Sequence, residues 1–166
     1  MHTAFIASFL ANILLALLSF VVLPDCRVAI HFSLGGAPDG WASNLTSTLL
    51  LLGTHLLVFL SLYLSPRLLT AAPRRWISLP NRDYWLTPER RSLASAKFSR
   101  LIWQFGTAVF LLMLVAGLLT LRANLADPVQ LNEGALLTAL VVFLSYTIFW
   151  TITLVQAFRI PPETNR

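Results

Sequence analysis

Residues 4–23 read AFIASFLANILLALLSFVVL, a run of 20 residues without a charged side chain. A helix needs about 20 predominantly apolar residues to cross the roughly 30 Å hydrocarbon core of a bilayer. Three further segments have the same character and also lack Asp, Glu, Lys and Arg: residues 45–65, 101–121 and 135–157. The sequence therefore predicts an all-α membrane protein with four transmembrane helices, in a single integral membrane domain over residues 1–166.

The composition of the whole chain agrees with this prediction. Hydrophobic residues make up 57% of the chain and charged residues only 11%, whereas an average soluble domain has about 25% charged residues. So few charges could not cover the surface of a soluble domain, but lipid solvates the exterior of a membrane protein. The first segment lacks the basic start and the small-residue cleavage site of a signal peptide, so we expect it to be retained as a helix.

Basic residues are distributed unevenly between the loops. Eight of them lie in residues 66–100 and two more in the C-terminal tail, against Arg27 and Arg122 in the other two loops. Because basic loops stay on the cytoplasmic side, this pattern places the 66–100 loop and both termini in the cytoplasm. Residues 24–44 and 122–134 then face outward. We expect the positive charge to meet anionic lipid headgroups rather than nucleic acid.

Small and hydroxyl-bearing residues recur along the first three spans at helical spacing. The expected faces are Ser8, Asn12, Ala16 and Ser19 on the first span, Ser47, Thr54, Ser61 and Ser65 on the second, and Gly106, Met113, Gly117 and Thr120 on the third. Such faces allow close helix packing in membranes. The alternative is a substrate path, which usually needs an ionisable residue inside the membrane. His55 is the candidate for that role, although we expect it to serve packing or hydrogen bonding.

The outer loop, residues 24–44, carries signals of ordered structure. Three apolar residues alternate with polar or small ones, as in a short strand: Val28, Ile30 and Phe32. Gly35-Gly36 and Asp39-Gly40 predict turns, because glycine tolerates positive φ. Two residues could cap the second helix, Ser43 and Asn44. We therefore expect a short but ordered loop.

Several residues of this loop resemble a known bacterial membrane family. They are Pro24, His31-Phe32, Gly36, Pro38-Asp39-Gly40 and Trp41. The pattern, over residues 5–65, resembles the family called domain of unknown function 1648, a module also found in SdpI-like immunity proteins. Residues 79–85 are similar to another segment of that family. The resemblance implies a bacterial plasma (inner) membrane protein with a role in toxin immunity or signalling.

The outer loop is the expected ligand-binding site, for a peptide or toxin. The residues assigned to it are His31, Phe32, Gly36, Pro38, Asp39, Gly40 and Trp41. We expect His31 to hydrogen-bond Asp39, and Phe32 and Trp41 to pack on the helix ends. A metal site built from His31, Asp25 and Asp39 would lack the regular spacing of metal ligands. No catalytic residue, metal or cofactor is expected.

The basic loop, residues 66–100, has an expected role in contacting lipid or a cytoplasmic partner. The residues assigned to it are Asn81, Arg82, Tyr84, Trp85, Arg90 and Arg91. Trp76, Tyr84 and Trp85 would rest at headgroup depth, while the basic side chains extend toward phosphates. Thr87 followed by Pro88 predicts a helix that begins there and continues into the third span.

The function favoured by the sequence is that of a non-enzymatic membrane protein whose outer loop recognises a ligand. The alternative is a small transporter or an accessory subunit, working as a homo-oligomer or within a membrane complex. A third hypothesis, a membrane-embedded hydrolase, requires His31, Asp39 and another ionisable group around one cavity. No phosphate-cradling glycine motif is present in the basic loop.

Overall fold

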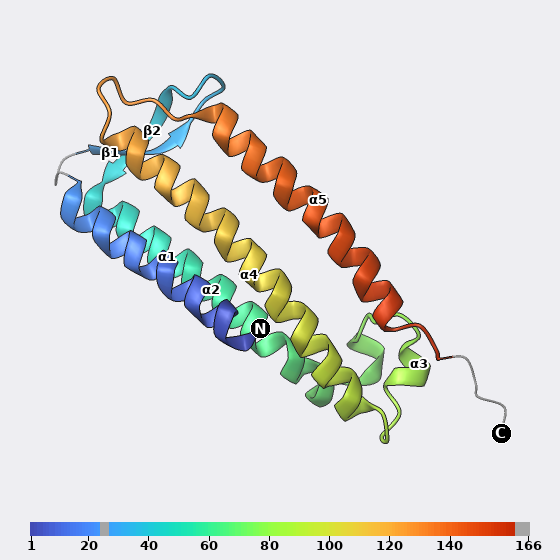
Figure 1. Ribbon diagram of the computed structural model, residues 1–166. Coiled ribbons are helices and arrows are strands. Elements are labelled where there is room, and N and C mark those ends of the chain that lie inside the picture. Colours follow the sequence, from blue (N-terminus) through green and yellow to red (C-terminus); the bar gives the residue numbers. More distant parts are fainter. Residues whose placement is uncertain (24–26, 162–166) are drawn as a thin grey trace.

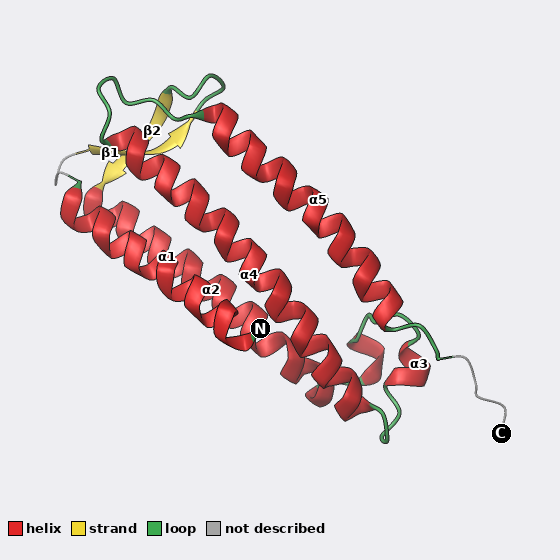
Figure 2. Cartoon of the chain, in the orientation of Figure 1, coloured by secondary structure: helices red, strands yellow, loops and turns green. Residues whose placement is uncertain are grey.

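The computed structural model describes residues 1–23 and 27–161 (Figure 1). The long helices in this part of the chain are α1 (His2–Val22), α2 (Asn44–Ala71), α4 (Arg91–Asn124) and α5 (Glu133–Ala157). Each of the four is long and apolar enough to cross a membrane, which confirms the predicted number of helices. One end of the bundle, here called the hairpin end, carries the strands β1 (Arg27–Phe32) and β2 (Pro38–Ser43). The other, called the basic end, carries η1 (Arg74–Trp76) and α3 (Arg82–Trp85) (Figure 2).

The central helix is α4, which contacts α1, α2 and α5 (Figure 1). Two glycines shape its face toward α1. A Cβ on Gly106 would come within 2.5 Å of the Phe5 ring, and a Cβ on Gly117 within 2.9 Å of Leu15. Small residues therefore let α1 and α4 approach closely, as predicted for the third span.

The polar face predicted for α1 is confirmed, because Ser8, Asn12 and Ala16 are all buried. The face predicted for α2 is wrong: the buried polar residues there are Asn44, Thr48 and His55, not Ser47, Thr54, Ser61 and Ser65. The physical reason is a set of hydrogen bonds that fixes the rotation of α2. The Asn44 amide donates to the last carbonyls of α1, and His55 reaches the side chain of Asn12.

The helix α2 is longer than hydropathy predicts, because it continues through Pro66 to Ala71. Proline has no N–H to offer the carbonyl four residues earlier. The Ser65 hydroxyl donates to that carbonyl, on Leu62, at 3.0 Å. The helix can therefore pass through the proline without leaving this carbonyl unsatisfied.

The start of α4 differs from the prediction. Residues 87–90 form a turn, in which the carbonyl of Thr87 accepts hydrogen bonds from the amides of Arg90 and Arg91. The helix itself begins at Arg91, so the predicted start at Pro88 is three residues too early. The N-cap of α4 is Arg90 and no side chain among the described residues caps the helix, so Thr87 is not the predicted cap.

The hairpin end contains a two-stranded antiparallel sheet (Figure 2). The predicted strand at residues 27–32 is confirmed, and so is the turn at Gly35 and Gly36, whose φ angles are +88° and +81°. The prediction of a second turn at Asp39-Gly40 is wrong, because both residues belong to β2. Proline is tolerated as the first residue of a strand, and Pro38 occupies that place. Ser43 caps α2 by accepting from the Thr46 amide at 3.1 Å.

Candidate functional site

The tip of the hairpin is held by the connection between α4 and α5. The Leu131 amide donates to the Gly36 carbonyl at 2.9 Å. The Gly35 amide donates to the Glu133 carboxylate at 2.8 Å, and the Gln130 side chain donates to the Gly35 carbonyl at 3.3 Å. Residues almost a hundred positions apart in the chain therefore fix the hairpin on its helices.

A second attachment joins the middle of β1 to the end of α4. The side-chain oxygen of Asn124 accepts from the Ala29 amide at 2.7 Å, and its side-chain nitrogen donates to the Ala29 carbonyl at 3.0 Å. The amide thus pairs with the strand backbone as a neighbouring strand would. The strand register shifts between Ala29 and His31, and here Ala29 is fully buried while Ile30 is exposed, against the predicted alternation.

The predicted pair of His31 and Asp39 is confirmed. The imidazole Nδ1 lies 2.5 Å from a carboxylate oxygen of Asp39. The side chains are 72% and 46% exposed, so the pair lies on the open surface of the hairpin. The register places Gly40 opposite His31, where a Cβ would come within 2.8 Å of the histidine Cβ. Glycine at position 40 therefore makes room for His31.

The other residues assigned to ligand binding lie around this pair. Phe32 and Pro38 are half-buried, Gly36 is buried, and Trp41 is 37% exposed with Arg27 stacked 5.9 Å from its ring centre. Asp25, considered as a metal ligand, lies outside the described residues. Within residues 1–23 and 27–161, no three His, Cys, Asp or Glu side chains come together as a metal site would require.

A buried hydrogen-bond network links the three central helices. The Asn12 amide nitrogen donates to the carbonyls of Ser8 and Phe110 at 2.8 and 2.9 Å. Its oxygen therefore faces His55, whose Nε2 lies 3.0 Å away. The other ring nitrogen of His55 lies 2.5 Å from the Leu51 carbonyl. His55 is thus the hydrogen-bonding residue expected from the sequence.

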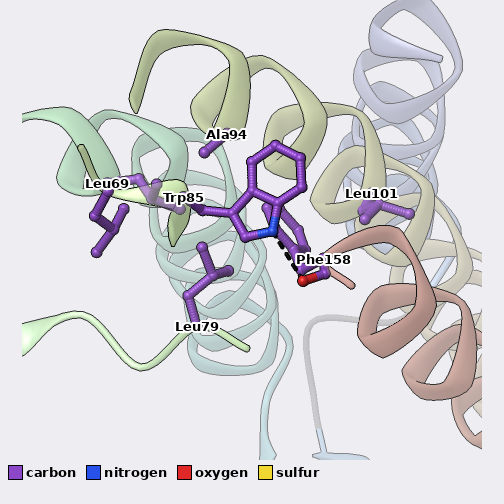
Figure 3. Close-up of a cluster of buried hydrophobic side chains, with 7 residues drawn as sticks. Leu69, Leu79, Trp85, Ala94, Leu101 and Phe158 are labelled. Atoms are coloured by element: carbon purple, nitrogen blue, oxygen red, sulfur yellow. Dashed lines mark hydrogen bonds between the residues drawn. The ribbon is translucent and has the colours of Figure 1, made fainter. Parts of the chain in front are cut away.

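The basic end contains a cluster of buried side chains around Trp85 (Figure 3). The Trp85 ring packs edge-on against Phe158, and its Nε1 donates to the Phe158 carbonyl at 2.8 Å. Asn81 donates to the same carbonyl at 2.8 Å. Trp85 is only 4% exposed, so its ring packs inside the protein. It holds the C-terminal end of α5, whereas Trp76 is 72% exposed.

Two basic residues of this end cap helices instead of pointing away from the protein. Arg91 donates to the carbonyls of Leu69 and Ala72 at the end of α2. Lys97 donates to the Ala157 carbonyl, the last of α5, at 2.8 Å. A positive charge at a helix C-terminus satisfies free carbonyls and opposes the helix dipole. The sequence prediction that these side chains extend toward phosphates is therefore wrong for both.

The remaining basic side chains are more exposed. Arg90 stacks 4.0 Å above the ring centre of Tyr84, and Arg82 lies 3.9 Å from the Asp83 carboxylate. Five further arginines at this end are exposed: Arg67, Arg74, Arg75, Arg100 and Arg159. The basic end therefore presents a strongly positive surface even after its two capping residues are set aside.

Comparison with known proteins adds no relative: no protein-family model matches the chain, and no curated protein or solved structure shows significant similarity to it. The function must therefore be inferred from the geometry of the chain itself.

Proposed function

We propose that the chain is a non-enzymatic, multi-pass protein of the bacterial inner membrane, whose hairpin recognises a ligand outside the membrane. The observation that carries this proposal is the exposed pair of His31 and Asp39 on a hairpin fixed by Asn124 and by residues 130–133. Exposed ion pairs contribute only about 0–1 kcal/mol to stability. A well-defined polar pair on a fixed hairpin is better suited to binding, because pre-organised groups lose less entropy when a ligand arrives.

The open position of the pair favours recognition over hydrolysis. A hydrolase would hold its histidine and carboxylate in a cavity with the reacting group, whereas His31 and Asp39 are largely exposed side chains. The choice of a peptide or toxin as ligand, and a role in immunity or signalling, is supported by the resemblance of residues 5–65 to the immunity-protein module.

The proposed orientation has both termini in the cytoplasm. Arg27 and Arg122 belong to the hairpin end, while residues 66–100, which include the end of α2 and the start of α4, carry eight basic residues at the opposite end. Both connections at the hairpin end are poor in basic residues, and the basic residues gather at the opposite end. This arrangement supports the positive-inside argument.

Cysteine labelling tests this orientation. In a Cys26→Ser background, Ala126→Cys at the hairpin end should react with a membrane-impermeant maleimide added to intact cells. Ser78→Cys, also at an exposed position but at the basic end, should react only after the cells are opened. The reverse pattern would overturn the orientation.

Substitution of the pair tests recognition. We expect His31→Ala and Asp39→Ala to reach the membrane at normal levels but to fail to restore the phenotype of a deletion strain. Leu34→Ala, at the 93% exposed tip of the same hairpin, serves as the matched control. If both pair variants restore the phenotype fully, or if both disappear from the membrane, the recognition role is wrong.

One observation favours a second function, that of a subunit in a homo-oligomer or membrane complex. The helix α5 has no buried residue and packs mainly against α4. In a Cys26→Ser background, Phe149→Cys on the exposed face of α5 should then form disulfide-linked dimers in membranes. Leu57→Cys on α2, which is 67% exposed against 66% for Phe149, is the control. Equal crosslinking at both positions would indicate random collision.

A further inference from the structure

A cavity of about 350 Å³ lies between α1, α2 and α4, beneath the hairpin. Its floor is made by Asn12, Ala16 and His55, which are no more than 4% exposed. Two apolar residues of its rim, Ile30 and Leu50, are exposed on the outer surface. The cavity therefore opens sideways, toward whatever surrounds the helices. Its volume falls within the range of small-molecule sites, roughly 300–1,000 Å³.

Three hydroxyl groups line this cavity and have no hydrogen-bond partner within residues 1–23 and 27–161: those of Ser47, Thr54 and Thr120. Elsewhere on the long helices, the hydroxyls of Ser61 and Thr107 donate to the carbonyl four residues earlier, at 2.7 and 2.8 Å. A hydroxyl without a partner in apolar surroundings is unfavourable by about 1–3 kcal/mol. The cavity hydroxyls are therefore free to bind a polar group of a ligand.

The polar groups of the floor, by contrast, are occupied. The Asn12 amide nitrogen donates to two backbone carbonyls, while the Asn12 oxygen and the Leu51 carbonyl lie against the two ring nitrogens of His55. Between the floor and the hydroxyls of Ser47 and Thr120, the walls are apolar and include Leu15, Leu51 and Met113. Along α2, Ser47 and His55 are separated by about 12 Å, at 1.5 Å per residue. The cavity thus offers hydroxyls near the hairpin, at Ser47 and Thr120, apolar walls below them, and a further hydroxyl, that of Thr54, beside the floor.

We propose that this cavity binds a neutral single-chain amphiphile of the long-chain alcohol class. The head hydroxyl bonds to Ser47 and Thr120, and the chain lies against Leu15, Leu51 and Met113. No Asp, Glu, Lys or Arg lines the cavity, and both ring nitrogens of the floor residue His55 already lie against Leu51 and Asn12, so a charged head would be buried without a free counter-charge. The sideways opening admits a ligand dissolved in the bilayer. This inference rests on the membrane location proposed above, and not on ligand recognition by the hairpin.

Photo-crosslinking tests the proposal on the full chain in lipid nanodiscs of defined composition. A long-chain alcohol that carries a diazirine in its chain should label peptides of α2 and α4 that line the cavity. Excess unlabelled alcohol should compete, while a carboxylate and an alkane of equal chain length should compete at least about tenfold less well. Equal competition by the alkane or the carboxylate would overturn the assignment of a neutral polar head.

Two matched pairs of variants locate the site. Ala116→Phe fills the cavity and should abolish labelling, whereas Ala108→Phe, in the apolar groove between α4 and α5, should leave it unchanged. Ser47→Ala combined with Thr120→Val should lower labelling about fivefold, as expected for the loss of about 1 kcal/mol of hydrogen bonding. The control is Ser61→Ala with Thr107→Val, whose hydroxyls are bonded within the helix.

If Ala116→Phe does not fold, the double variant Ser47→Ala with Thr120→Val still tests the proposal. Its substitutions change side-chain volume little, so we expect it to fold. Labelling that persists in the Ser47 and Thr120 double variant overturns the proposal. So does labelling that maps to the groove between α4 and α5 and is lost in Ala108→Phe. The cysteine-labelling experiment at Ala126 and Ser78 reports independently on membrane orientation.

Discussion

Two adjacent glycines at the hairpin tip differ in what a side chain would meet there. Both have positive φ angles, +88° at Gly35 and +81° at Gly36. A Cβ on Gly35 would meet nothing within 4 Å, but a Cβ on Gly36 would overlap the carbonyl of Leu131. A side chain would therefore cause backbone strain at both positions, but only at Gly36 would it also collide with Leu131, in the connection between α4 and α5.

This difference gives a prediction at the scale of single residues. Gly35→Ala should lower stability by about 1–2 kcal/mol, which is the cost of a left-handed alanine. Gly36→Ala should lower it by at least about 1 kcal/mol more, because the Leu131 hydrogen bond to Gly36 is also disturbed. Thermal unfolding of the two variants in the same detergent measures the difference. Equal unfolding temperatures would show that the contact with Leu131 adds nothing to stability.

Asn124 provides a second prediction at this scale. Its amide both accepts from and donates to Ala29, and it also donates to the Thr120 carbonyl. Asn124→Asp keeps the shape but removes the donor, so a carboxylate would face two carbonyls. We expect a loss of about 1–3 kcal/mol and faster hydrogen exchange at the Ala29 amide. Gln130→Glu, at an exposed contact of the same loop, is the control and should change exchange at Ala29 little.

At the scale of elements, Arg90 and Arg91 are neighbours in sequence with different roles. Arg91 caps α2 through two carbonyls, whereas Arg90 lies over the Tyr84 ring. Bonds from a charged donor contribute about 1.5–3 kcal/mol, and an exposed cation–π contact about 0.5–1 kcal/mol. We therefore expect Arg91→Met to lower the unfolding temperature clearly more than Arg90→Met. Glutamate at either position should be worse than methionine if anionic lipid also contributes.

The elements also show where sequence patterns stop being informative. Hydropathy locates the four helices, but it identifies only the apolar segment of each helix and not its full length. The polar continuation of α2 to Ala71 and the start of α4 at Arg91 are stabilised by capping and by tertiary contacts, which hydropathy does not register. Sequence patterns also do not reveal the strand β2, because Pro38 and Gly40 are typical turn residues, and only pairing with β1 makes this segment a strand.

At the scale of the whole molecule, contacts between the first and second halves of the chain determine the fold. Asn12 bonds to Phe110, Ala29 to Asn124, and Arg91 to Leu69. These pairs are separated by 98, 95 and 22 residues, so they cannot be predicted from local sequence patterns. The His31–Asp39 pair, only 8 residues apart within one hairpin, could be predicted from the sequence. The cavity could not, because it depends on the rotation of three helices.

These long-range contacts predict that the chain can assemble from two pieces. Fragments 1–78 and 79–166, expressed together, should be recovered as a complex when only the first carries an affinity tag. Asn12→Leu in the first fragment should reduce recovery, because it leaves His55 and the Phe110 carbonyl without their buried partner. Ser61→Ala, whose hydroxyl bonds only within α2, is the control. Failure to recover the second fragment would show that covalent continuity is needed.

The attachment of the hairpin tip has a consequence for how the protein is made. Ribosomes synthesise α1, the hairpin and α2 first, and the backbone groups of Ala29 and Gly36 gain their partners only when Asn124 and Leu131 have emerged. A nascent chain that stops earlier therefore displays an unfinished hairpin, whose backbone groups at Ala29 and Gly36 lack these partners. Quality-control proteases could distinguish a truncated copy from a complete one by that exposed edge alone.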